Sequence, residues 1–131
     1  MGFQTALQTG GMYPERLSAL LPWLDWVGLD IKGPLQRYET ITGTPGSGDK
    51  TWASLRRLLA SGVAYECRTT WHAGLFSAAE LRALADDLAV RGVTDWALQE
   101  CRAPGAEAWG LSAAQVRELE QRFAHFTLRR G

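Results

Sequence analysis

The sequence predicts an α/β protein, a partial β/α barrel of four parallel β/α units in a single domain, residues 1–131. Segments with the period-two alternation of a strand are each followed by a segment with helical spacing, which favours a parallel sheet with right-handed crossovers. Three of the strand segments also carry polar side chains along one face. A doubly wound sheet is covered by helices on both faces and favours apolar runs, so the repeated polar face indicates a lumen or a concave site.

The clearest strand is predicted at residues 25–32. One of its faces is aliphatic, and the other places Asp30 and Lys32 side by side at the carboxyl end. Gly33-Pro34 ends this strand, and a proline suits the first turn of the helix that follows. In β/α barrels the chemistry lies at the carboxyl ends of the strands, so the functional site is expected here.

Before this strand, the chain predicts one strand and one short helix. Residues 3–9 alternate like a strand that ends at Gly10-Gly11, and a short helix runs from Pro14 to Pro22. After it, a second short helix begins at Pro34 with Gly43 as its C-cap. The elements that follow it are a loop at 43–48 and a helix capped by Asp49 that ends at Gly62.

The second half of the chain repeats the strand–helix order. Residues 63–72 and 94–101 alternate like strands. Each is followed by a capping box that opens a helix, Ser77 with Glu80 and Ser112 with Gln115, and the first of these helices ends at Gly92. Residues 126–129 fit either a short terminal strand or a helix end.

The overall composition excludes several classes of function. The formal net charge is zero, which gives no electrostatic argument for binding nucleic acid or an acidic membrane surface. No apolar run approaches the roughly 20 residues that span a bilayer, and the first residues lack the pattern of a signal peptide. We therefore expect a cytoplasmic protein without membrane or nucleic-acid partners.

The two cysteines, Cys67 and Cys101, form no CxxC motif and are expected to be buried free thiols rather than a disulfide. An iron–sulfur cluster usually takes about four thiolates. The sequence also lacks the GxGxxG, GxxxxGK[ST], HExxH and GxSxG motifs.

Several polar residues on the predicted strands are candidates for a ligand site. Asp30 and Lys32 fit an anion-binding or amino-acid-binding pair or a catalytic lysine, and they fit a structural ion pair as well. Arg68 offers a planar fork for carboxylate or phosphate, unless it pairs with Glu66 or Asp30. His72 fits an acid–base group or a hydrogen-bonded structural histidine.

Two further positions complete the candidate set. Gln99 suits recognition of a base or ribose edge, and Gln8 with the Gly10-Gly11 turn suits a close approach to a ligand. The six tryptophans are expected mostly in the core or between sheet and helices. A stacking platform for nucleic acid is not expected without a basic surface.

Some of these residues form a recognisable series. The series is Asp30-Ile31-Lys32-Gly33-Pro34-Leu35, Tyr38-Glu39, Thr42-Gly43, Tyr65-Glu66-Cys67-Arg68-Thr69-Thr70-Trp71-His72 and Leu98-Gln99. It resembles the C-terminal part of radical S-adenosylmethionine proteins of the anaerobic ribonucleoside-triphosphate reductase activating type, which belong with the glycyl-radical-enzyme activases. The resemblance runs from about residue 2 to residue 102.

The resemblance implies the C-terminal part of a (β/α)6 barrel that binds S-adenosylmethionine inside. By analogy, Asp30 and Lys32 hold the carboxylate region of the cofactor, Arg68 contacts its ribose or carboxylate side, and Gln99 lies by the adenosine. The turn after the first strand, with Gln8, Thr9 and Gly10, lies near the methionine end. His72 completes the implied cofactor-binding set.

The sequence also departs from the family pattern. The CxxxCxxC motif that holds the family's 4Fe-4S cluster and a Gly-Gly-Glu motif are absent. Gln8-Thr9-Gly10-Gly11 stands where relatives often carry an acidic residue before Thr-Asn-Gly, which weakens any cation site there. The chain is therefore expected to be a C-terminal part that does not cleave the cofactor alone. Its first strand has an unpaired edge that favours a homodimer.

The function implied by the resemblance is activation of a glycyl-radical enzyme, such as anaerobic ribonucleotide reductase, through a 5′-deoxyadenosyl radical and a flavodoxin-type reductant. One alternative is a barrel lyase that uses Lys32, but position 35 is Leu where the orotidine-phosphate decarboxylase pattern has Asp. A second alternative is a non-catalytic domain that binds S-adenosylmethionine or another protein.

Overall fold

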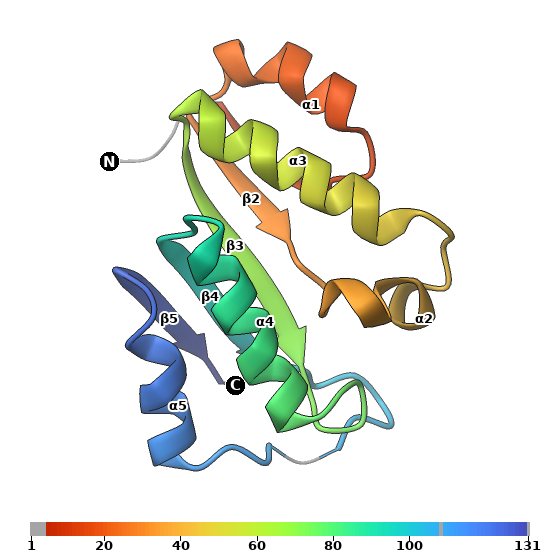
Figure 1. Ribbon diagram of the computed structural model, residues 1–131, viewed down its shortest axis with the longest axis vertical. Helices are drawn as coiled ribbons and strands as arrows, with labels where there is room; N and C mark the ends of the chain where they lie inside the picture. The colour runs from red at the N-terminus through yellow and green to blue at the C-terminus, as the bar shows by residue number, and fades with distance from the viewer. Residues whose placement is uncertain (1–4, 108, 131) are drawn as a thin grey trace.

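The computed structural model describes residues 5–107 and 109–130 (Figure 1). The strands are β1 (Ala6–Thr9), β2 (Trp26–Asp30), β3 (Ala64–Trp71), β4 (Asp95–Glu100) and β5 (His125–Arg129). The α-helices are α1 (Pro14–Leu20), α2 (Tyr38–Thr42), α3 (Ser47–Ser61), α4 (Ala78–Val90) and α5 (Ala113–Glu120). Two short 3-10 helices, η1 (Leu21–Trp23) and η2 (Leu35–Arg37), adjoin α1 and α2.

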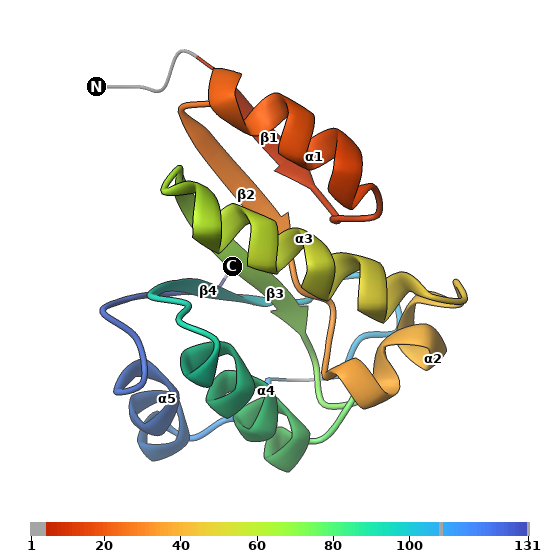
Figure 2. The same ribbon diagram turned by 45° about the horizontal axis from the view of Figure 1, so that its top comes forward.

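The strands form one parallel sheet in the order β1-β2-β3-β4-β5. Helices α1, α3, α4 and α5 lie on the same side of this sheet in both ribbon views (Figures 1 and 2). The predicted parallel α/β architecture is therefore confirmed. In the described part of the chain the opposite face of the sheet has no helical cover, and we call it the open face.

The strand positions agree with the sequence pattern to within one or two residues. Residues 126–129, which fit either a strand or a helix end by sequence, lie in β5 (His125–Arg129), and β5 pairs with β4. The predicted first strand is observed from Ala6 to Thr9, and its expected start, residues 3 and 4, lies outside the described residues. Within those residues β1 pairs only with β2, so self-association through its other edge stays a prediction.

The start of α3 differs from the sequence prediction. Asp49 is not its N-cap, because the helix begins at Ser47 after Gly46, and Asp49 lies in the first turn. A Cβ atom on Gly48 would lie 2.9 Å from both Leu35 Cδ1 and Tyr38 Cβ. Glycine at this position allows α3 to begin three residues earlier than predicted and to pack directly on the preceding segment.

Both predicted capping boxes are present. Ser77 accepts a hydrogen bond from the backbone of Glu80, and the Glu80 side chain accepts one from the backbone of Ser77. Ser112 and Gln115 make the same reciprocal pair at the start of α5. Gly43 follows α2 in the left-handed conformation, as predicted for a C-cap.

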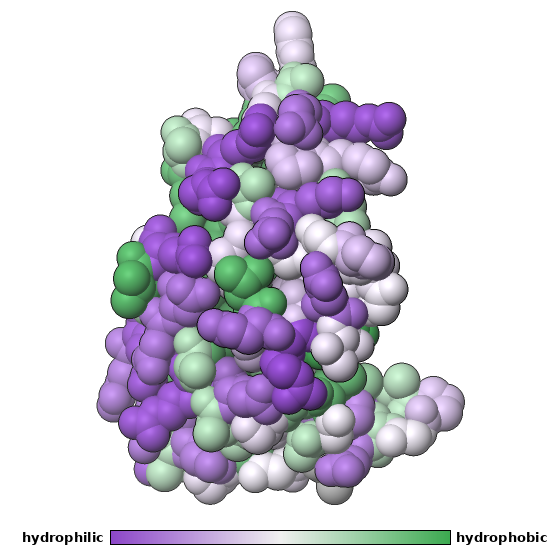
Figure 3. Space-filling view, turned by 45° about the vertical axis from the view of Figure 1, so that its right-hand side comes forward, coloured by the Kyte–Doolittle hydropathy of each residue, from purple (hydrophilic) through white to green (hydrophobic). Residues whose placement is uncertain are grey.

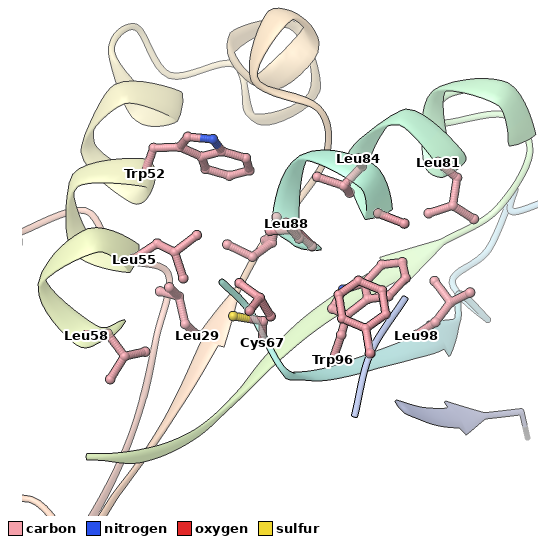
Figure 4. Close-up of a cluster of buried hydrophobic side chains, with 14 of the residues drawn as sticks. Leu29, Trp52, Leu55, Leu58, Cys67, Leu81, Leu84, Leu88, Trp96 and Leu98 are labelled. Atoms are coloured by element: carbon pink, nitrogen blue, oxygen red, sulfur yellow. The ribbon is translucent and has the colours of Figure 1, made fainter. Parts of the chain in front are cut away.

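The hydrophobic core lies between the sheet and its helices (Figure 4). The aliphatic residues of β2 are fully buried, and Cys67 and Trp96 continue this layer on β3 and β4. Leu55 and Leu88 cover them from α3 and α4. Trp96 Nε1 donates a 3.0 Å hydrogen bond to Thr69 Oγ1, so its polar atom is satisfied inside the core.

The surface seen in Figure 3 is mainly hydrophilic, with apolar residues in small separate patches. None of the helices in the described residues has the length and hydropathy needed to cross a bilayer.

Replacement of Leu88 by Ala is expected to lower the free energy of unfolding by about 2–5 kcal/mol, because the side chain is fully buried against the sheet. Val90 on the same helix is 86% exposed and serves as the control. Val90→Ala is expected to change stability by about 0.5 kcal/mol or less. Urea unfolding of both variants measures the difference, and equal losses would contradict the placement of the core.

Candidate functional site

The polar side chains predicted on the strands lie together on the open face. In the register of the sheet Asp30 is aligned with Arg68. Thr70 is aligned with Gln99 on β4, and Gln99 is aligned with Arg129 on β5. Because the sheet is parallel, the carboxyl ends of these strands meet at one edge, where ligands of α/β proteins are usually bound.

A hollow of about 220 Å³ lies at the carboxyl ends of β2 and β3, and we call it the first hollow. Asp30, Lys32, Arg68 and Thr70 contribute its polar lining. Lys32 Nζ lies 3.8 Å from the Asp30 carboxylate, and the two side chains are 49% and 53% exposed. An ion pair this exposed contributes little to stability, so its charges are available to a ligand.

The backbone under this pair is held by Tyr38. The Tyr38 hydroxyl accepts a hydrogen bond from the backbone N–H of Lys32 at 3.1 Å and donates one to the carbonyl oxygen of Asp30 at 3.4 Å. Burial raises the pKa of Tyr38 above its ordinary value, which keeps the hydroxyl protonated. The phenol therefore fixes the strand end from which both charged side chains project.

Arg68 is positioned by two contacts on the open face. Its Nε donates a 2.8 Å hydrogen bond to Glu66, and its guanidinium lies 5.0 Å from the centre of the Trp26 ring. The Trp26 ring lies over Gly28, where a Cβ atom would come within 2.9 Å of the indole. Glycine at position 28 is therefore needed for the ring and the guanidinium to lie flat on the sheet.

Glu66 also accepts hydrogen bonds from the Nη1 and Nη2 atoms of Arg129, at 3.0 and 3.2 Å. Partial burial acts to raise the pKa of Glu66, but hydrogen bonds and charges from Arg129 and Arg68 outweigh it and hold the pKa below its ordinary value. The carboxylate therefore stays ionised and links β3 to β5. Of the two pairings weighed for Arg68, the structure shows the one with Glu66.

The remaining predicted residues are more scattered. Gln8 is exposed on the open face of β1, and Thr9 Oγ1 accepts a hydrogen bond from the backbone of Gly11. The carbonyl oxygen of Gly10 accepts one from Thr51. Neither Gln8, Thr9 nor Gly10 lines the first hollow, so a ligand that touches them must extend beyond it.

His72 organises the loops at the end of β3. Its Nδ1 accepts hydrogen bonds from the backbone N–H groups of Gly74 and Glu107, at 3.1 and 3.2 Å. This nitrogen therefore acts as an acceptor, which places the proton of the neutral ring on Nε2. The structural alternative for His72 has direct support, whereas contact with a cofactor stays a prediction.

Gln99 lines a second, larger hollow at the carboxyl ends of β4 and β5. Thr70 lines both hollows, so they adjoin on the open face. The two cysteines stand apart from this arrangement. Cys67 is buried, and burial raises the pKa of its thiol, while Cys101 follows β4 and is partly buried. Both are free, as predicted.

The part of the chain that the structure describes contains no group of three or more His, Cys, Asp or Glu side chains suited to a metal ion. No protein-family model matches the sequence, and no match was found among the curated proteins. The chemistry of the site therefore has to be argued from its geometry.

Sequence reasoning missed three parts of the site. Trp26 lies on the open face because it is four residues before Asp30 on β2, and every second residue of a strand points to the same face. The alternation in the sequence could therefore have placed Trp26 in the site. The links from Glu66 to Arg129 and from Glu100 to Arg130 join residues far apart in the chain. No local pattern predicts such pairs.

Protonation of Glu66 is expected to weaken the protein at low pH. Because the pKa is lowered in the folded state, the stabilisation is present above the ordinary pKa of glutamate, 4.5, and is lost as the pH falls through the lowered value. Urea unfolding should show Glu66→Gln less stable than the wild type at neutral pH, with the gap closing at acidic pH. A gap independent of pH would contradict this.

Replacement of His72 by Ala is expected to expose the backbone N–H groups of Gly74 and Glu107 to solvent, because their acceptor is removed. Hydrogen exchange measured by NMR should be faster at these two amides and unchanged in the sheet. Gln99→Ala, an exposed substitution on the neighbouring strand, is the control. Equal exchange in the two variants would show that His72 does not hold the loops.

Proposed function

We propose that this chain binds S-adenosylmethionine on the open face of its sheet, as the cofactor-binding part of a glycyl-radical-enzyme activase of the anaerobic ribonucleotide reductase type. The observation that carries the proposal is the convergence of Asp30, Lys32 and Arg68 on one hollow at the carboxyl ends of adjacent parallel strands. The resemblance that names the cofactor includes these same three residues.

The charges of the first hollow fit the amino-acid end of the cofactor. A free amino acid group carries an ammonium and a carboxylate close together, and Asp30 and Lys32 present the opposite charges 3.8 Å apart. The Asp30 carboxylate suits the ammonium, and the Lys32 ammonium suits the carboxylate. Both side chains are half exposed, so a ligand can replace their mutual contact without burying an unpaired charge.

The rest of the cofactor would extend towards β4. The first hollow is small, at about 220 Å³, but it adjoins the second hollow at Thr70, where Gln99 lies in register. An adenosine group placed there would reach the Gln99 amide. Arg68, which lies between Asp30 and this region on β3, would orient the ribose or carboxylate side while Glu66 and Trp26 keep its guanidinium in place.

The residues present do not fit an iron–sulfur cluster. The sequence has two cysteines, and Cys67 is buried under the sheet with its pKa raised, far from the thiolate state that a cluster requires. No electron-transfer step is therefore assigned to this chain. When bound, S-adenosylmethionine would supply the 5′-deoxyadenosyl group for hydrogen abstraction from a partner's glycine, and these residues would bind and orient it.

The small number of cysteines favours one second candidate, a domain that binds S-adenosylmethionine without radical chemistry. The two candidates share the same binding site and differ in whether the chain works beside a cluster-bearing partner. Reconstitution with a glycyl-radical enzyme and a cluster-bearing activase segment distinguishes them by electron paramagnetic resonance of the glycyl radical.

Isothermal titration of S-adenosylmethionine into the purified chain tests the proposal. Binding should be saturable and should weaken about tenfold or more in Lys32→Ala and in Arg68→Ala, because each removes a charge-assisted hydrogen bond. Lys50 is an exposed lysine on α3, on the helical side of the sheet, and Lys50→Ala should bind like the wild type.

The experiment has two outcomes that would overturn the proposal. One is absence of binding by wild-type chain that unfolds cooperatively in urea. The other is binding that Lys32→Ala and Lys50→Ala leave equally strong, which would place the cofactor away from the first hollow.

A further inference from the structure

The second hollow, at the carboxyl ends of β4 and β5, has a volume of about 680 Å³. Small-molecule sites typically measure roughly 300–1,000 Å³. Three arginines contribute to its lining, Arg102, Arg129 and Arg130. Two of them lie on or just after β5, a strand beyond the part of the sequence that resembles a known family.

Two partly buried carboxylates hold these arginines in place. Glu100 is 15% exposed and accepts hydrogen bonds from Arg102 at 3.2 Å and from Arg130 at 3.4 Å. Glu66, 18% exposed, holds Arg129 in the same way. The three arginine side chains are between 43% and 64% exposed, so the guanidiniums are more accessible to solvent than the carboxylates that bind them.

The cluster carries an excess of positive charge. Glu66 and Glu100 together bind four arginines, since Arg68 also pairs with Glu66. A guanidinium has five N–H donors, more than these contacts use. The remaining donors are held in forks that match the oxygen atoms of a phosphate group. The formal net charge of the whole chain is zero, so the residues outside this cluster carry a net negative charge.

The hollow also offers contacts for an organic group. Leu128 is 37% exposed beside the arginines and provides an apolar surface. The Arg130 guanidinium lies 4.9 Å from the centre of the Trp109 ring, which limits its movement. Thr70 supplies a hydroxyl at the inner border. A bare anion would leave these contacts unused.

We propose that the second hollow is a binding site for a phosphate ester of a small polar organic molecule. The phosphate lies on Arg102, Arg129 and Arg130, and the organic part lies along Leu128. The arginines that contact the phosphate differ from the pair Asp30 and Lys32, although Thr70 and Gln99 also line this hollow, where the adenosine of S-adenosylmethionine is placed. Variants of Lys32 and of the arginines therefore test the two proposals separately.

Isothermal titration with ribose 5-phosphate, ribose and inorganic phosphate tests the ligand class. Ribose 5-phosphate should bind about tenfold or more tightly than either ribose or inorganic phosphate, since it alone satisfies both parts of the hollow. Equal binding of inorganic phosphate would overturn the role of the organic part. Binding of a phosphoserine peptide but not of ribose 5-phosphate would overturn the assignment to a small molecule.

Variants locate the ligand. Arg102→Gln and Arg130→Gln should each weaken binding of ribose 5-phosphate about tenfold or more, while Arg117→Gln, at an exposed position on α5, should not. Arg102 is the most exposed of the three, so its replacement leaves the fold intact. Lys32→Ala should keep its binding of ribose 5-phosphate, while its binding of S-adenosylmethionine weakens. Loss in Lys32→Ala with no loss in Arg102→Gln and Arg130→Gln would overturn the proposed site.

Discussion

The confinement of helices to one face of the parallel sheet governs the rest of this molecule. Burial of Val27, Leu29 and Ile31 against α3 and α4 removes one strand face from water, and period two then sends every alternate side chain to the open face. A shift of one residue in β2 would exchange the aliphatic residues for Asp30. The hydrophobic effect therefore fixes the register, and the register places the charged groups.

The charged residues near the carboxyl ends of the strands require their own means of being held in place. Glu66 on the open face and Glu100, which is in register with the buried Trp71 on the helical side, are too buried to be left unpaired, since an uncompensated charge in a partly dry site is costly. Each is neutralised by two arginines on the strands or strand ends around it. The guanidiniums near the carboxyl ends of β3, β4 and β5 are therefore oriented by carboxylates that are less exposed than the arginines themselves.

Local patterns in the sequence predicted most of the fold. Alternation predicted the strands around Asp30, Arg68 and Gln99, and the capping boxes at Ser77 and Ser112 predicted two helix starts, because these signals act within one or two turns of the chain. The start of α3 was not predictable in the same way. It depends on the contact of Gly48 with Leu35 and Tyr38, which exists only once the helices pack.

The sequence predicted which residues form the candidate site, but not which of its charged side chains form ion pairs with one another. Asp30 ends β2 and Lys32 follows it by two residues, so their contact follows from their short separation along the chain. The sequence left two possible partners for Arg68, Glu66 and Asp30. The pairing with Glu66 is coupled to Arg129, which lies 63 residues from that glutamate along the chain. Such a choice depends on which strand becomes the neighbour of β4, and that is decided by the whole sheet.

The charged residues at the two hollows differ in rigidity, and this difference bears on ligand binding. At the end of β2, Tyr38 fixes the backbone while the side chains of Asp30 and Lys32 remain half exposed. At the second hollow, β5 is the edge strand of the sheet, but the guanidiniums of Arg129 and Arg130 are hydrogen-bonded to Glu66 and Glu100. A zwitterionic group needs charges that can separate to admit it, whereas a phosphate gains most from donors already held in position. Each hollow therefore has the form of rigidity that suits the ligand proposed for it.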